Sequence, residues 1–484
     1  MTPHFSGLLA EWRRFRAARG LTLAMVASVL VTVSLGLLVA AGARTSCVTG
    51  KGEGPCPAPL LGPDGTAVRD KYFYVHQPLK GDGSLIARVV GMTGQIRLPD
   101  AVPGVRNVAE GVVPWAKAGI LVRQSLEQGT PYAAVMLTGG HGVRMQHDYV
   151  HDVAGGPHNG PQWLRLTRSG ELVSGHESDD GRTWTEVGTV RLAGLPETVE
   201  IGLFATSPGV LWESAQAFAQ VTATFDQVKG MSGPWRHDDV GVVLESDGKT
   251  PHHPGAAVES GDRLLVTGGG DIGPATVEGG LRADLTLVGG ALGLIPVLVA
   301  AVVFGRGIRR DPPAGAAVAG AVAFVAGLVS AGVVVPAGLA LLRANQNPIQ
   351  PISPSIGARV IVGYALLAAV AAVLAVGLAV LVRRAVVAAG LAVGLVVVPH
   401  LVAGAGVTGA GVAPWLPAFT PAAGFAITQS VPAYAHVAAG PSPYPLAPWA
   451  GLAVACGYAA LVLGAATAVR RSRPTARPAV PGRP

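Results

Sequence analysis

The chain alternates between long apolar stretches and one extended segment that has the patterning of a soluble protein. Six stretches carry almost no charge and hold about 20 apolar residues, enough to cross the roughly 30 Å hydrocarbon core of a bilayer as a helix. A charge at mid-membrane costs roughly 3 kcal/mol, so this lack of charge predicts membrane spans. They lie near 21–43, 285–304, 314–342, 358–382, 385–403 and 446–469.

The first stretch has two interpretations. Basic residues precede it and the sequence Ala41-Gly42-Ala43 ends it, a pattern typical of a signal-peptide cleavage site. Its apolar run extends from 21 to 43, however, whereas a signal-peptide core has roughly 7–15 residues. We therefore expect an uncleaved span that follows a cytoplasmic basic segment at 1–20.

Residues 44–284, between the first two stretches, show the pattern of a strand-rich domain. Short runs of alternating apolar and polar residues recur, for example at 85–90, 163–167 and 198–204, with turn residues between them. The sequence Ser-Asp-Asp-Gly-Arg-Thr-Trp at 178–184 predicts a hairpin, because Asp-Gly readily adopts the positive φ angles of a tight turn. This spacing predicts an antiparallel β-sandwich at about 70–228, large enough to fold alone.

The predicted fold class is thus a multi-span α-helical membrane protein of about six helices, with an extracytoplasmic all-β sandwich inserted between helices one and two. A five-helix domain at 285–469 and a basic tail at 470–484 follow the sandwich. Composition agrees, because half of the residues are hydrophobic and 13% are charged.

The distribution of arginine predicts the orientation in the membrane. Fourteen arginines flank one side of the predicted spans, whereas Arg44, Arg343 and Arg359 flank the other. By the positive-inside rule both termini are cytoplasmic, and 44–284 lies outside a plasma membrane that the chain crosses several times. The net charge of +7 therefore comes from membrane-flanking arginines and indicates no nucleic-acid partner. The fourteen are Arg13, Arg14, Arg16, Arg19, Arg306, Arg309, Arg310, Arg383, Arg384, Arg470, Arg471, Arg473, Arg477 and Arg483.

The three cysteines fall into two groups. Cys47 and Cys56 lie in a short Gly-rich loop just outside the first span, where an oxidising environment predicts a disulfide between them. Cys456 lies within the last span, where we expect a small apolar packing residue.

Four segments of the predicted sandwich carry a family resemblance: 83–89 (GSLIARV), 115–123 (WAKAGILVR), 163–168 (WLRLTR) and the 178–184 hairpin. They resemble the concanavalin A-like lectin and glucanase sandwiches, in particular small domains of unknown function in actinobacterial secreted proteins. The resemblance implies a jelly-roll, and a glycan or another extracellular ligand as its partner. Tryptophans could stack on a sugar, although in a sandwich they more often belong to the core; they are Trp115, Trp163 and Trp184.

The apolar part shows a second resemblance, carried by Arg13-Arg14-Phe15-Arg16 before the first span and by 420–432 (TPAAGFAITQSVP) and 444–451 (YPLAPWAG). These segments are similar to actinobacterial ABC exporter permeases of the second type, over about 10–45 and 265–472. The resemblance implies a permease-like membrane subunit that works as a homodimer or beside a second permease. A separate ATPase subunit would hydrolyse ATP.

One departure concerns the loop that would meet such an ATPase. At 305–313 it is short, and its two prolines disfavour a continuous helix. The remaining docking candidates are Arg309 and Arg310 in this loop, and Trp12 and Phe15 on one face of the basic N-terminal segment. That segment could instead lie on membrane lipid.

Other motifs give little evidence of catalysis. The pattern G-x-G-x-x-G at 268–273 is followed by Pro274 rather than by a helix, so we interpret it as a turn near the membrane. His147 and His151 have ligand-like spacing but lie in a strand end and a Gly-rich loop. The acidic residues Glu177, Asp179, Asp180 and Glu186 cluster on one predicted hairpin, where turn formation is their commoner role. We therefore expect no enzyme activity, metal or cofactor in this chain.

Two functional hypotheses follow. The first is a permease-like membrane subunit of an ABC-type exporter with an outer binding or sensory sandwich. The second is a membrane-anchored surface protein whose sandwich binds a glycan or a protein partner without transport. The resemblance of the spans favours the first, and the short 305–313 loop favours the second.

The arginine count makes a testable prediction about topology. Single cysteines placed in the 404–445 loop should react with a membrane-impermeant maleimide on intact cells, because that loop holds no Lys, Arg, Asp or Glu and is expected outside. Cysteines placed in the 470–484 tail should react only after the cells are opened. Labelling of the tail on intact cells would refute the predicted orientation.

Overall fold

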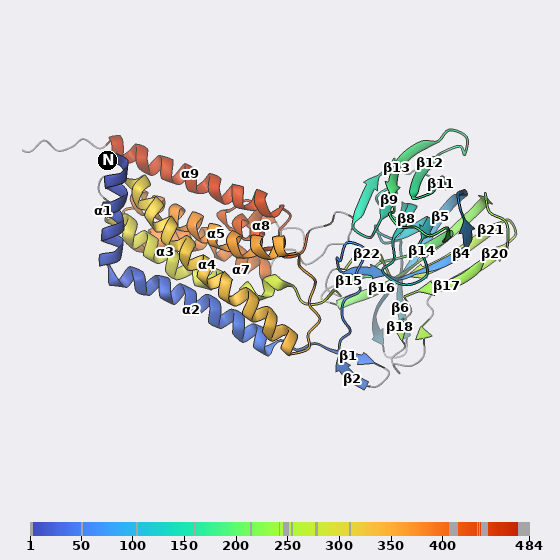
Figure 1. The fold of residues 1–484 in the computed structure, drawn as a ribbon, viewed down its shortest axis with the longest axis horizontal. Coiled ribbons are helices and arrows are strands. Elements are labelled where there is room, and N and C mark those ends of the chain that lie inside the picture. Colours follow the sequence, from blue (N-terminus) through green and yellow to red (C-terminus); the bar gives the residue numbers. More distant parts are fainter. Residues whose placement is uncertain are drawn as a thin grey trace, which may run out of the picture.

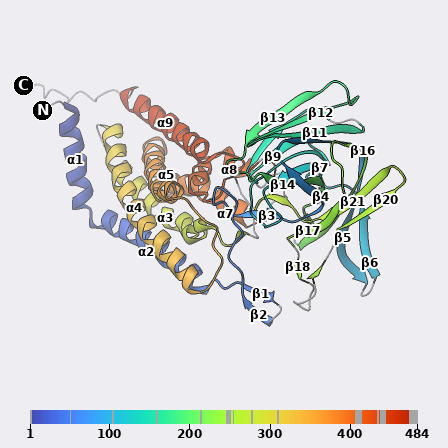
Figure 2. The same ribbon diagram turned by 45° about the vertical axis from the view of Figure 1, so that its right-hand side comes forward.

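The chain forms a bundle of long helices with a β domain at one end of it (Figure 1). The first helix and the carboxyl end of the last lie at the opposite end of the bundle (Figures 1 and 2). The computed structural model describes residues 3–49, 52–102, 105–157, 160–212, 215–241, 243–244, 251–252, 255–275, 279–308, 311–405, 415–432, 434, 436 and 444–472.

All six predicted spans are helices that are long and apolar enough to cross a membrane. The fifth is interrupted at Val397, just before Pro399, so it consists of two helices, α6 and α7. The spans are α2 (Arg19–Gly42), η2 with α3 (Ala283–Leu287 and Gly290–Arg306), α4 (Pro312–Ala344), α5 (Pro354–Leu381), α6 with α7 (Ala385–Val396 and Val398–Gly404) and α9 (Pro448–Ser472).

Among the described residues, three shorter helices complete the helical part. Helix α1 (Pro3–Ala17) lies across the end of the bundle (Figure 1). Helices α8 (Trp415–Ala418) and η3 (Pro421–Thr428) precede the last span, and η3 packs against α5 and α9. The segment that was expected to be an outer loop therefore contains helical turns buried at the edge of the bundle.

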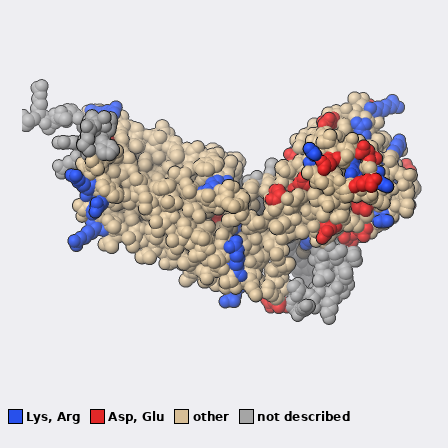
Figure 3. Space-filling view, in the orientation of Figure 1, with Lys and Arg blue, Asp and Glu red and all other residues tan. Residues whose placement is uncertain are grey.

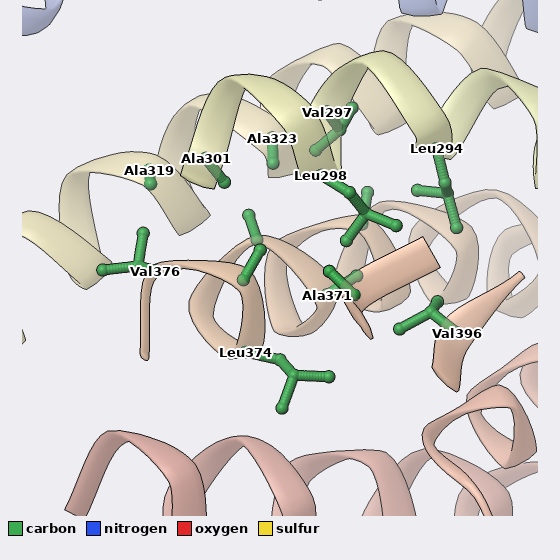
Figure 4. Packing of buried hydrophobic residues seen from close by; sticks show 14 of the residues in the cluster. Leu294, Val297, Leu298, Ala301, Ala319, Ala323, Ala371, Leu374, Val376 and Val396 are labelled. Carbon is green, nitrogen blue, oxygen red and sulfur yellow. The ribbon is translucent and has the colours of Figure 1, made fainter. Parts of the chain in front are cut away.

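The bundle is held together by close packing of small residues. Leucine, valine and alanine side chains of α3, α4, α5 and α6 interlock at its centre (Figure 4). A Cβ at Gly36 would lie 2.1 Å from the carbonyl oxygen of Thr286, and one at Gly293 would lie 1.9 Å from Oγ1 of Thr32. Small residues let the backbones of membrane helices approach closely. The van der Waals contacts that result stabilise the bundle, because lipid tails are as apolar as the side chains and provide no hydrophobic driving force.

The β domain consists of two large antiparallel sheets. The seven-stranded sheet has the order β10 (His151–Ala154), β9 (Val143–His147), β8 (Tyr132–Thr138), β7 (Lys117–Arg123), β14 (Thr198–Thr206), β4 (Tyr72–Lys80) and β17 (Arg236–Val240). The nine-stranded sheet has the order β13 (Thr185–Arg191), β12 (Leu172–Ser178), β11 (Gln162–Ser169), β5 (Gly83–Val102), β16 (Ala215–Lys229), β21 (Arg263–Gly269) and β20 (Ala256–Ser260), with β6 (Val105–Glu110) paired to β5 and β15 (Val210–Trp212) to β16.

Alternating side chains of the two sheets form one core. Val75 and Ile120 point into it from the seven-stranded sheet, and Leu85, Leu164 and Phe225 from the nine-stranded sheet, all fully buried. The alternation of apolar and polar residues in the sequence therefore reflects this packing, in which every second side chain faces the core. The predicted hairpin at 178–184 is confirmed as the connection between β12 and β13.

Three pairs of short strands lie outside the large sheets. They are β1 (Ser46–Thr49) with β2 (Gly52–Pro55), β3 (Val68–Asp70) with β22 (Ile272–Pro274), and β18 (Val243–Leu244) with β19 (Pro251–His252).

The predicted disulfide is confirmed, since Cys47 and Cys56 are bonded across the β1–β2 hairpin. Cys456 is exposed on α9, so the expectation that it packs against other helices is wrong.

The sandwich extends beyond the predicted boundary at residue 228. Strands β20 and β21 continue the nine-stranded sheet and β17 closes the seven-stranded one. The boundary was missed because only Val266 of β21 is a fully buried large side chain, so the alternation there is weak.

This longer boundary predicts which fragment folds alone. A fragment of residues 57–275 should melt cooperatively, whereas 70–228 should melt at least about 10 °C lower or be unfolded, because it exposes one side of β16 and of β4. Circular dichroism of both fragments at the same concentration measures the difference. Equal melting temperatures would show that β17, β20 and β21 contribute no stability.

Candidate functional site

The chain enters and leaves the sandwich through one pair of strands, β3 and β22. Asp70 pairs with Ile272 and Val68 with Pro274. We call residues 68–70 and 271–275 the stalk, because they connect the sandwich to α2 and α3. The stalk lies on the outward face of the seven-stranded sheet, where Val68 and Ile272 are buried among Tyr72, Tyr74, Leu121, Tyr132 and Phe204.

A buried ion pair fastens the first strand of the stalk. The guanidinium of Arg123 donates to Oδ2 of Asp70 at 3.0 Å, and both side chains are fully buried. Arg123 also donates to the hydroxyl of Tyr72 and to the carbonyl oxygen of Glu127. The hydroxyl of Tyr149 donates to the same Asp70 oxygen at 2.8 Å. A buried ion pair is stable only while both charges are present, because removing one side chain leaves the other charge buried without compensation.

A second ion pair fastens the other strand. Lys117, on β7, donates from Nζ to Oδ1 of Asp271 at 2.9 Å and to the carbonyl oxygen of Ile272. The Lys117 side chain is almost fully buried, and Arg69 lies 3.7 Å from the other oxygen of Asp271. Each strand of the stalk is thus tied to the sheet by a buried cation on β7.

These contacts cover a region of the seven-stranded sheet that could otherwise bind a ligand. Burial raises the pKa of Tyr132 and of Tyr149 far above the usual value, so both remain neutral hydroxyls. The stalk therefore covers the part of the outward side of the seven-stranded sheet around Tyr72, Tyr132 and Tyr149.

A histidine from the segment before the last span joins this region. Nε2 of His436 donates to the carbonyl oxygen of Tyr149 at 3.1 Å, and its ring lies edge-on to Trp115 at 6.4 Å. Burial lowers the pKa of His436, so the imidazole stays neutral. The sandwich is therefore linked to the helical part by this residue as well as by the stalk.

The three predicted sugar-stacking tryptophans do not share a surface. Trp115 is 7% exposed and stacks on His141 at 3.9 Å, with Arg144 over its ring. It therefore packs against its own domain, as the core interpretation requires. Trp163 and Trp184 are half-buried and lie on the outward side of the nine-stranded sheet.

That outward side, which we call the outer face, pairs aromatic rings with cations. Arg88 and Lys229 lie 5.6 and 5.7 Å from the ring centre of Trp163, and Arg165 lies 4.5 Å from that of Trp184. Arg88 is neutralised by a bidentate bond to Asp226, at 2.6 and 2.7 Å.

Two cations of the outer face keep their charge available. In the described part of the chain, neither Arg165 nor Lys229 has a carboxylate within ion-pair distance. The strand register places them in one row, on either side of Ile86, about two strand spacings or roughly 10 Å apart. This arrangement can hold an anionic group beside an apolar ring.

A further polar cluster had no signal in the sequence. His76 is fully buried, with Nδ1 2.7 Å from Oε2 of Glu200 and Nε2 2.8 Å from Oδ2 of Asp238. Its ring stacks on Tyr74 at 4.7 Å. The partners are 124 and 162 residues away, so only the strand order brings them together. The cluster fastens the edge strand β17 to β4.

Other candidates serve local structure. His147 and His151 pair across the β9–β10 hairpin and stack on each other at 4.4 Å. Backbone N–H groups of Thr183 and Arg182 donate to Asp180 and lower its pKa to about 2, which is the behaviour of a turn-forming carboxylate. The glycine-rich motif at 268–273 joins β21 to β22, so it leads directly into a strand and not into a helix.

The predicted docking residues have different environments. Trp12 is 42% exposed, whereas Phe15 is buried edge-on against Phe304 at 5.4 Å. The expectation that both present one docking face is therefore wrong for Phe15, because its ring fills the end of the bundle. Arg309 and Arg310 lie outside the described residues.

Comparisons with known proteins assign no family. No family model matches the chain, and no curated protein matches it. A functionally unknown protein from Saccharomyces cerevisiae is similar in structure at 14% identity and a TM-score of 0.19, over 33% of this chain and 74% of that one. The GH43 protein BlXynB from Bacillus licheniformis is similar at 15% identity and a TM-score of 0.17, over 29% of this chain and 26% of that one. Values this low carry no argument about function.

The stalk predicts a large effect of one substitution. Arg123→Met in the 57–275 fragment should lower the free energy of unfolding by roughly 3–5 kcal/mol, because Asp70 would stay buried without its cation. Arg191→Met removes an exposed, solvent-screened pair with Glu171 and should leave the free energy of unfolding nearly unchanged. Urea unfolding measures both, and equal costs would contradict the role given to Arg123.

Proposed function

We propose that this chain is a permease-like membrane subunit of an ABC-type exporter, which works with a separate ATPase. The observation that carries the proposal is the position of α1. This helix crosses the end of the bundle farthest from the β domain and packs on the turn between α3 and α4 (Figure 1). On the predicted topology that end is cytoplasmic, where an ATPase would act.

The contacts between α1 and the turn are specific. Arg14 donates to the carbonyl oxygen of Phe304, while Glu11 pairs with the same guanidinium at 3.0 Å. A Cβ at Gly307 would lie 1.9 Å from the Arg14 guanidinium, so a larger residue there would displace the guanidinium from this position. Near the start of α1, a Cβ at Gly7 would lie 3.5 Å from the carboxylate of Asp311.

These contacts add surface to the 305–313 loop, which is short. The loop alone offers few residues for docking, but α1 and the described part of the turn together form a broader surface. The exposed cations of α1, Arg13 and Arg16, add a basic side to that surface. In this proposal α1 takes the place of the polar helical stretch that such permeases carry in the loop.

The other end of α3 is positioned to pass motion to the outer domain. Asp284, at the start of this span, accepts a hydrogen bond from Ser430, which follows η3. Leu281 pairs with Ile349, just before α5, and the stalk ends a few residues earlier. A shift of α3 would therefore reach Ser430 and the bridge between Leu281 and Ile349, a few residues along the chain from the stalk.

The outer face favours a second function, that of a membrane-anchored binding protein. Arg165 and Lys229 without carboxylate partners, beside Trp163 and Trp184, suit an acidic glycan. In this alternative the spans serve as an anchor and no ATPase is needed. The two functions are compatible if the sandwich recognises the cargo of the exporter.

The permease proposal predicts a partner that depends on the seat of α1. Full-length protein from its native host, purified in mild detergent, should retain a nucleotide-binding subunit that hydrolyses ATP. Gly307→Leu should reduce the bound subunit at least about fivefold, because the new side chain displaces Arg14 from Phe304. The ratio of the two proteins, measured by quantitative mass spectrometry, checks this.

A second glycine provides the control for that experiment. A Cβ at Gly332 of α4 meets no atom within 4 Å, so Gly332→Leu should leave the ratio unchanged. If the wild-type protein carries no such subunit, the anchored binding protein becomes the better account. If both variants lose it equally, α1 is not the docking element.

A further inference from the structure

We propose that the chain binds one anionic phospholipid in a groove between α2 and α4. The groove has a volume of about 520 Å³, within the roughly 300–1,000 Å³ of ligand pockets. It opens on the side of the bundle, and its walls are apolar. They consist of Trp12 from α1, Met25, Val26, Val29 and Leu30 from α2, and Ala321, Val322, Val325, Ala326 and Val329 from α4.

The groove and the arginine that precedes it on α2 together match one leaflet of a bilayer. Arg19, Val26 and Leu30 follow one another on a single stripe of α2, because residues seven and eleven positions apart share a face. From Arg19 to Leu30 the helix rises about 16 Å. This is close to half of the roughly 30 Å hydrocarbon core. Arg19 and the groove lining at Val26 and Leu30 thus together extend over about one leaflet, from the membrane surface toward the midplane.

The charges at the mouth of the groove indicate the headgroup. Arg16 lies one turn after Trp12 on the same side of α1, and Arg19 begins α2. Both are exposed, and within the described part of the chain neither has a carboxylate in ion-pair range, since Glu11 pairs with Arg14. On the face shown in Figure 3, cations gather at the two ends of the helical body, and its length is uncharged.

A phospholipid matches both the apolar groove, which would bind its acyl chain, and the arginines at the mouth, which would bind its anionic headgroup. Val26, Leu30, Val325 and Val329 remain roughly half exposed, so the protein itself leaves room on them for an apolar chain to pack by van der Waals contact. A chain in the groove would cover them, while Arg16 and Arg19 would bind the phosphate. Trp12 would lie at the level of the headgroup, where tryptophan is favoured at membrane interfaces.

Lipid retention tests this inference on the full-length protein. The protein is placed in nanodiscs of equal phosphatidylglycerol and phosphatidylcholine, extracted into mild detergent, and weighed by native mass spectrometry. We expect one retained phosphatidylglycerol. Arg16→Gln with Arg19→Gln should weaken its retention roughly thirtyfold, since each arginine near an anionic surface contributes roughly fivefold. Arg383→Gln with Arg384→Gln, an exposed pair after α5, should leave retention unchanged.

A steric variant separates the groove from general lipid contact. Val26→Trp should fill the groove and expel the lipid, whereas Leu461→Trp, on the exposed side of α9, should not. Equal retention of both phospholipids, or equal loss in both arginine pairs, would overturn the proposal. So would efficient cross-linking of Val26→Cys to the same residue of a second copy with no lipid bound, because a protein interface would then occupy the groove.

Discussion

The architecture depends on two buried cations of a single strand. Arg123 and Lys117 of β7 hold Asp70 and Asp271, which lie on the two strands by which the chain enters and leaves the sandwich. Isolated charges could not remain in that apolar setting, so each aspartate keeps its strand on the sheet. Because the stalk is fixed in this way, the sandwich has one side turned to the helical part and one side, the outer face, available for recognition.

The helical part obeys a different constraint, which is close approach between backbones. Gly36, Gly293 and Gly327 each lie where a Cβ would collide with a neighbouring helix. Such contacts leave the bundle closely packed at its centre while α2, α6 and α9 keep broad exposed sides. Exposed apolar sides are what a lipid or a second membrane subunit requires, so the bundle is suited to a larger assembly.

The sequence predicted what is periodic and local. All six spans, the two-sheet domain, the 178–184 hairpin and the Cys47–Cys56 disulfide follow from hydropathy, alternation, turn chemistry and spacing. Contacts that depend on strand order were missed, such as His76 between Glu200 and Asp238. Phe15 was misassigned because helical spacing shows which residues share a face, but not which face meets the bundle.

The adjacency of β3 and β22 has a consequence for the history of the molecule. The chain enters and leaves the sandwich through neighbouring strands about 5 Å apart. At the junction the helices therefore meet two adjacent chain ends, as they would if a short hairpin loop joined them. Gly36 and Thr286 on the flanking helices already touch without help from the insert. A domain with neighbouring termini can be gained, lost or exchanged at such a junction without repacking the spans. The sandwich and the spans can therefore evolve as separate modules within one gene.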